Sequence, residues 1–84
     1  MPRFYFDVRD GEKLSRDVKG LEFPTLEVAR EQAAGALAEW VRLALGDSAA
    51  GRRIAVEIRD QARELLLQMA LTYEVKDHSP GRLH

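Results

Sequence analysis

The sequence predicts a two-layer α+β domain with the element order strand, strand, helix, strand, strand. Residues 25–45 form the one long segment with helical period, and segments of alternating apolar and polar residues flank it on both sides. Asp10-Gly11 follows the first such segment and is a strong short-range hairpin signal. We therefore expect one helix packed on one face of a mainly antiparallel four-stranded sheet, whose other face or open edge meets solvent or another molecule.

Length, composition and charge bound the class of protein. The chain has 84 residues, which is room for one domain with a thin core. Its 13 basic and 14 acidic residues argue against broad attraction to nucleic acid or anionic membranes. The absence of cysteine excludes disulfides, thiolate metal sites and thiol catalysis. Neither a signal peptide nor a membrane span is recognisable, so we expect a cytoplasmic protein.

The first hairpin begins almost at the N-terminus. Apolar residues alternate over residues 4–8, as expected for a strand with one buried face. The return strand over residues 12–18 is less regular. Asp17 and Gly20 predict a turn or bulge before alternation resumes at residues 21–23.

The helix has recognisable ends. Thr25 is a suitable N-cap residue, and Gly46 is the expected residue after the last turn. Its alanine content would let the helix axis approach the sheet closely. Centred on Trp40, the predicted buried stripe comprises Leu26, Ala29, Ala33, Ala36, Leu37, Trp40 and Ala44.

The second hairpin has alternating residues 54–58, a turn at residues 60–63 and a long last strand over residues 65–75. The length and the apolar face of the last strand favour a central place in the sheet, and we assign the other central place to the first strand. A single domain is expected over residues 1–76, with a flexible tail at residues 77–84. The predicted core consists of Phe4, Phe6, Val8, Leu37, Trp40, Val56, Ile58, Leu67, Met69 and Leu71.

Residues 6–10 and 56–60 share the order apolar, acidic, apolar, arginine, aspartate. A true internal repeat would extend into the following strands, and this one does not. We interpret the echo as two hairpins that obey the same turn rules, with a duplication as the alternative.

The opening Met1-Pro2-Arg3-Phe4-Tyr5-Phe6-Asp7, the Arg9-Asp10-Gly11 turn, and the segment from Asp17 through Gly20 to Pro24 are the most distinctive strings of the chain. With these strings the chain resembles a family of short bacterial proteins of unknown function, over most of residues 1–76. That resemblance implies a family label and brings no activity or site residues. At the level of fold alone, residues 23–27 resemble the start of the helix in the partner-binding domains of bacterial antitoxins.

No pattern indicates catalysis, a cofactor or a metal. Residues 46–53 have the glycine spacing of a phosphate loop, but they lack its lysine and would run from helix to strand. His78 and His84 are the two histidines, and both lie in the expected tail, where no preorganised metal site forms.

The acidic residues of the first hairpin are the remaining candidates for chemistry. A buried carboxylate pair could serve acid–base catalysis. On a solvated hairpin we expect these residues instead to cap turns, protect an edge or pair with Arg9 and Arg16. The residues concerned are Asp7, Asp10, Glu12 and Asp17.

These observations favour a non-enzymatic protein–protein interaction module, expected to form a homodimer through the bare sheet face or an exposed edge. The interface residues proposed from the sequence are Tyr5, Ala55, Leu66 and Ala70. The alternatives are an antitoxin-like partner-binding domain, a small enzyme and a nucleic-acid-binding module. The last of these is less favoured, because nucleic-acid sites usually place aromatic residues among the basic ones and this sequence does not. The basic patch of the last alternative comprises Arg52, Arg53, Arg59 and Arg63. No small-molecule ligand and no membrane contact are implied.

Overall fold

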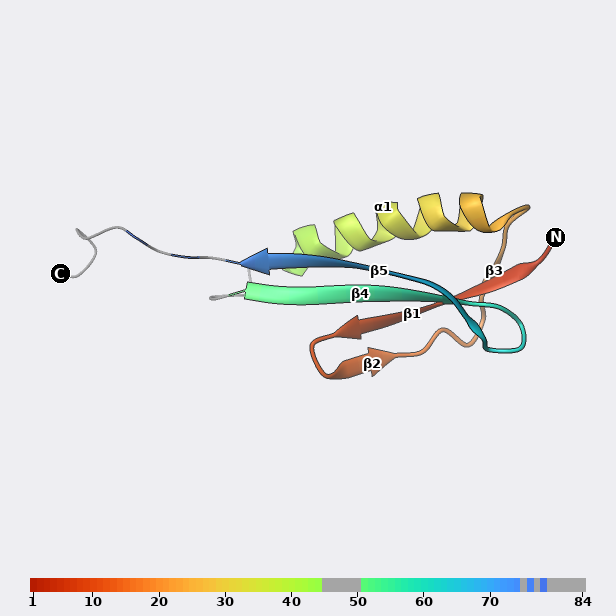
Figure 1. Ribbon diagram of the computed structural model, residues 1–84, viewed down its shortest axis with the longest axis horizontal. Helices are drawn as coiled ribbons and strands as arrows, with labels where there is room; N and C mark the ends of the chain where they lie inside the picture. The colour runs from red at the N-terminus through yellow and green to blue at the C-terminus, as the bar shows by residue number, and fades with distance from the viewer. Residues whose placement is uncertain (45–50, 75, 77, 79–84) are drawn as a thin grey trace.

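The computed structural model describes residues 1–44, 51–74, 76 and 78. One helix, α1 (Leu26–Ala44), packs on one face of an antiparallel sheet (Figure 1), which confirms the predicted α+β class. The strands are β1 (Arg3–Asp10), β2 (Lys13–Ser15), β3 (Leu21–Glu22), β4 (Gly51–Arg59) and β5 (Leu65–Glu74). Gly46, the phosphate-loop-like segment before Gly51 and most of the expected tail lie outside the described residues.

The strands follow the order β2-β1-β4-β5, and β3 also pairs with β1. The first strand is central, as predicted. The prediction for the last strand was wrong, because β5 pairs with β4 and lies at the edge. The apolar residues alternate in β5 because one face of the strand lies under the helix. Such a face is equally compatible with an edge strand, since it does not require a paired strand on both sides.

The predicted interruption of the return strand is present. β2 pairs with the C-terminal half of β1 and β3 with its N-terminal end. Between them, residues 16–20 leave the ladder. The Phe6 backbone N–H, which lies between these two pairings, donates to the Asp17 carboxylate at 3.0 Å. The expected single strand is therefore two short ones, and the sheet has five strands.

Thr25 caps α1 as predicted, because its Oγ1 accepts a hydrogen bond of 3.2 Å from the Val28 N–H. Ala29, Ala33 and Leu37 form the buried line of the helix. The predicted centre of the stripe was wrong, since Trp40 is 44% exposed. Residues four apart lie on nearly the same side of a helix, so Ala29, Ala33 and Leu37 form one buried line. Trp40 does not belong to this four-residue series, and its indole lies at the border of the buried surface.

The core lies between α1 and the three longest strands. Leu71 was wrongly assigned to it and is 43% exposed, because the helix covers β5 incompletely. Phe23 extends the core beside β1 and stacks on Phe6, with ring centroids 5.9 Å apart. The buried apolar cluster comprises Phe4, Ala29, Ala33, Leu37, Ile54, Val56 and Ile58. Partly buried residues packed against it are Phe6, Val8, Phe23, Val41, Leu67 and Met69.

Candidate functional site

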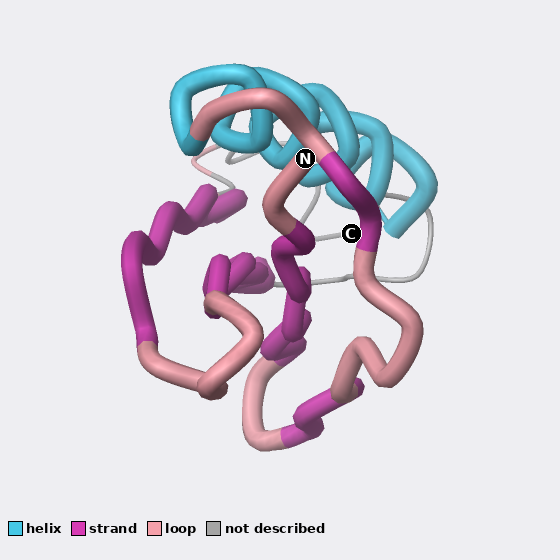
Figure 2. Tube along the Cα trace, turned by 90° about the vertical axis from the view of Figure 1, so that its right-hand side faces the viewer, coloured by secondary structure: helices cyan, strands magenta, loops and turns pink. Residues whose placement is uncertain are grey.

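The sheet face turned away from α1 is called the open face here. Figure 2 shows the helix on one side of the strands and the open face on the other. Side chains alternate along a strand, so the residues between the core positions of β1 and β4 belong to this face. Asp7 on β1 and Glu57 on β4 are direct neighbours in the register. They are the buried acidic residues of the described chain, at 2% and 5% exposure.

Three arginines surround these two carboxylates, and we call the five residues the arginine–carboxylate cluster. Arg9 donates to Glu57 at 2.7 Å, and Arg59 donates to the other oxygen of Glu57 at 2.8 Å. Arg63 donates to Asp7 at 2.8 Å, and Arg59 lies 3.3 Å from the same Asp7 oxygen. The expectation that Asp7 belongs to a solvated hairpin and pairs with Arg9 or Arg16 was wrong. Its charged partners come from β4 and the β4–β5 turn, which sequence proximity does not reveal, and its other oxygen accepts the Asp17 backbone N–H at 3.0 Å.

The cluster favours the ionised form of Glu57. Hydrogen bonds from Arg9 and then Arg59 hold the pKa of Glu57 below its ordinary value. The hydrogen bond to Glu57 in turn raises the pKa of Arg59. A general acid at neutral pH needs a raised carboxyl pKa, which is the opposite shift. The arrangement of Glu57 is therefore that of a structural ion pair.

The echo between residues 6–10 and 56–60 falls on β1 and on the end of β4, and these two strands pair with each other. Asp7 lies opposite Glu57, and Val8 lies opposite Val56, so antiparallel strands with the same pattern place like residues side by side. The two terminal aspartates then act differently. Asp10 accepts two hydrogen bonds from Arg52, at 2.9 and 3.0 Å. Asp60 accepts the backbone N–H groups of the β4–β5 turn.

Asp17 and Gly20 organise the segment between β2 and β3. One Asp17 oxygen accepts the Phe6 N–H, and the other accepts the N–H groups of Lys19 and Gly20 at 3.1 and 2.9 Å. Burial raises the pKa of Asp17, but the donors from Gly20, Phe6 and Lys19 outweigh this effect and lower it. Gly20 has a φ of 68°, and an added Cβ would lie 2.9 Å from the Phe4 carbonyl oxygen. The Asp-x-x-Gly spacing is therefore a requirement of this close backbone approach.

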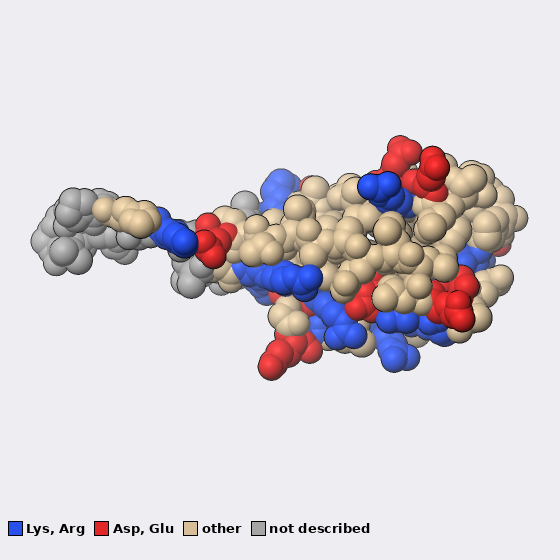
Figure 3. Space-filling view, viewed as in Figure 1, with Lys and Arg blue, Asp and Glu red and all other residues tan. Residues whose placement is uncertain are grey.

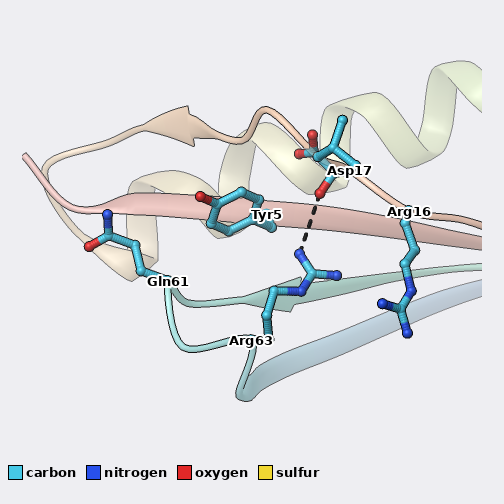
Figure 4. A pocket seen from close by; sticks show the side chains of 6 residues that line it. Tyr5, Arg16, Asp17, Gln61 and Arg63 are labelled. Carbon is cyan, nitrogen blue, oxygen red and sulfur yellow. Dashed lines mark hydrogen bonds between the residues drawn. The ribbon is translucent and has the colours of Figure 1, made fainter.

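A shallow hollow of about 290 Å³ lies beside this segment (Figure 4). Arg63 crosses it, with its guanidinium 5.2 Å from the centre of the Tyr5 ring. The same guanidinium donates to the Asp17 carbonyl at 3.3 Å and to Asp7. The Arg63 guanidinium in the hollow therefore already has partners within the chain, namely Asp7, the Asp17 carbonyl and the Tyr5 ring. The lining residues are Tyr5, Arg16, Asp17, Val18, Gln61 and Arg63.

The free side of β5 differs in character from the open face, and we call it the β5 edge. No described strand pairs with this side, and no charged residue occurs from Leu65 to Tyr73. Leu65, Leu66 and Leu71 are 50%, 39% and 43% exposed. Figure 3 shows this side of the molecule as a broad uncharged strip with charged side chains above and below it.

A groove of about 550 Å³ separates the N-terminal half of α1 from β5. Leu26 and Arg30 line it on the helix, and Leu67 lines it on the strand. The β5 edge therefore presents both a row of backbone groups and an apolar depression beside them.

The proposed interface residues are distributed over two surfaces. Tyr5 is half-buried beside Arg63, and Ala55 is completely buried between its neighbouring strands, so Ala55 cannot make the contact proposed from the sequence. Leu66 and Ala70 are exposed on β5. The structure therefore locates the accessible apolar residues of this set on the β5 edge.

The basic patch is largely paired with carboxylates. Arg52 contacts Asp10, while Arg59 and Arg63 belong to the arginine–carboxylate cluster. Arg53 is exposed. No group of histidine and acidic side chains in the described part of the chain could hold a metal ion. Within the same part, no helix has the length and apolar character needed to cross a membrane.

Fold and surfaces together define a small two-layer α+β domain with a charged, internally paired sheet face and one uncharged strand edge. The chain belongs to the family described as domain of unknown function DUF6894, whose model matches residues 3–72. The match agrees with the resemblance to a family of unknown function. Neither the curated proteins nor the solved structures contain a match to this chain.

Proposed function

We propose that the protein is a non-enzymatic protein–protein interaction module that accepts a strand at the β5 edge. The observation that carries the proposal is the ten-residue strand β5, which pairs on one side and carries no charge before Glu74. Natural proteins usually protect such an edge with lysine, proline, a bulge or a short strand. An edge of this length without protecting charges is suited to strand addition by a partner.

The open face supports this choice by contrast. If a partner bound the open face through the cluster arginines, these arginines would have to give up their contacts with Asp7 and Glu57 and bind acidic groups of the partner instead. That exchange leaves two buried carboxylates without their arginine partners, which is strongly unfavourable. The same contacts leave the nucleic-acid alternative with little unpaired positive charge, because Arg52, Arg59 and Arg63 already contact acidic groups.

A photo-crosslinking amino acid placed in the host cell tests the proposed surface. We expect protein adducts when the probe replaces Ala70 on the β5 edge. The matched control replaces Ser15, an exposed residue of β2 at the opposite edge of the sheet. Adducts at Ser15 with none at Ala70 would place the interaction elsewhere, and adducts at neither position would contradict an interaction through the sheet edges.

A further inference from the structure

We infer that the partner at the β5 edge is a second copy of the same chain. The two β5 strands would pair antiparallel across a two-fold axis and join the two sheets into one, with both helices on the same face. This inference rests on the proposed function, since it identifies the occupant of that edge. It explains in addition why helix α1 leaves a groove beside β5.

The position of α1 leaves room for the helix of a second copy. Because the helix contacts both β4 and β5, we infer that its axis lies above the space between these strands. Neighbouring strands lie about 4.8 Å apart, so the helix axis is displaced from β5 by about 2.4 Å toward β4. A two-fold axis between two paired β5 strands would lie about 2.4 Å from β5 on the opposite side. The two helix axes would then be about 10 Å apart, close to the 8–10 Å of packed helices.

The groove is lined on the helix by Leu26, Glu27 and Arg30, and beyond it the same side of α1 carries small residues that permit this approach. Arg30 lines the groove, and Ala34 and Ala38 follow at the four-residue spacing that keeps side chains on one side of a helix. Both alanines are exposed in the single chain. Because α1 and β5 run in the same direction (Figure 1), antiparallel β5 strands would bring the two helices together antiparallel.

The size and charge of the surface also suit a second copy. Ten strand residues span about 33 Å, and the strip from the strand edge to the helix is about 20 Å wide, which gives roughly 650 Å² per subunit. Specific interfaces bury about 600–1,000 Å² per partner. A two-fold axis through β5 places uncharged residues opposite uncharged residues, so no like charges meet along the stretch from Leu65 to Tyr73.

The first test is the mass of the purified protein in solution, measured by light scattering at micromolar concentration. We expect twice the chain mass of 9.5 kDa. Ala70→Lys and Leu71→Lys should each give a monomer, because a lysine on either face of the β5 edge would bring two positive charges together at the axis. Leu21→Lys, which alters an exposed leucine on β3 away from β5, should remain a dimer.

Circular dichroism of each variant separates loss of the dimer from loss of the fold. Disulfide crosslinking through single introduced cysteines locates the two-fold axis. The chain has no cysteine of its own that would interfere. Single cysteines at Gln68, Ala70 and Thr72 should form disulfide-linked homodimers with a maximum at one or two of these positions, whereas Ser15→Cys should not. A dimer that survives both lysine variants, or that crosslinks best through Ser15→Cys, would overturn the inference.

The failure of this inference differs from the failure of the proposed function. A monomeric wild-type protein whose Ala70 probe crosslinks to a different protein would exclude the second copy but retain strand addition at β5. A monomer without adducts at Ala70 would contradict both.

Discussion

Asp7 and Glu57 lie directly opposite each other on neighbouring strands, and both are buried on the sheet face that the helix does not cover. Two like charges in this position destabilise a sheet unless cations intervene. Arg9, Arg59 and Arg63 provide those cations from three different segments. The ion pairs on the open face therefore link β1, β4 and the β4–β5 turn to one another.

Glu57→Gln should lower the free energy of unfolding at pH 7 by about 2 kcal/mol, because it removes one charged partner from a buried pair whose arginines remain partly hydrated. The pKa of Glu57 is lowered in the folded state, so its contribution is present above its unfolded pKa of about 4.3 and is lost as the pH falls below that value. Urea unfolding between pH 3 and pH 7 should therefore show a smaller loss of stability at low pH in the variant. Glu12→Gln, at an exposed hairpin position, is the control and should leave the free energy of unfolding at pH 7 unchanged.

Gly20→Ala should destabilise the fold by about 2–4 kcal/mol. The substitution combines an unfavourable positive φ with contacts of 2.9 Å to the Arg3 and Tyr5 side chains and the Phe4 carbonyl. Thermal unfolding should show a clear fall in the midpoint temperature.

Two other glycines separate the causes. Gly11 has a φ of 64° but open space around it, so Gly11→Ala should cost about 1 kcal/mol from the backbone alone. Gly35 lies inside α1, where an added Cβ would meet no other part of the chain within 4 Å, so Gly35→Ala should stabilise by about 0.5–1 kcal/mol. Equal effects at Gly20 and Gly11 would show that the close approach to β1 is unimportant.

Asp17→Ala should destabilise by about 2–3 kcal/mol, since the Phe6 N–H loses its acceptor in the gap between β2 and β3. Asp17→Asn keeps one oxygen and should recover part of this loss. Chemical denaturation of both variants provides the comparison. An Asn variant less stable than the Ala variant would contradict the assignment of the side chain as a backbone acceptor.

Arg63 carries the one positive φ of a non-glycine residue among the described residues, at 67°. Arg63→Gly relieves that conformation but removes a partner of Asp7, whereas Arg63→Ala only removes the partner. We expect both variants to be less stable than the wild type, with the glycine variant about 1 kcal/mol more stable than the alanine variant. The reverse order in urea unfolding would argue against a backbone contribution.

Local patterns were sufficient to predict the elements of the fold. Alternation identified the strands, Thr25 identified the start of the helix, and Asp17 with Gly20 identified the break in the return strand. Strand order depends on which edges pair, and the alternation in β5 is the same at the centre of a sheet as at its edge. The last strand was therefore misplaced.

The surfaces were harder to predict for a different reason. Asp7 and Arg63 are 56 positions apart, and their contact exists only because β1 and β4 pair in one particular register. Their chemical types are common on solvated hairpins, so composition gives no sign of a buried cluster. The echo between residues 6–10 and 56–60 was the one available signal, since antiparallel pairing of like patterns brings their acidic positions together.

Amide hydrogen exchange along β5 is the most direct test of the claim that a second copy of the chain adds its β5 strand at this edge. Half of the β5 N–H groups point away from β4 and are exposed to water in a single subunit. At micromolar concentration we expect these amides to be protected as strongly as those facing β4, and to lose protection on dilution and in Ala70→Lys. Alternate β5 amides that exchange rapidly at every concentration, beside protected amides in β1, would contradict the account.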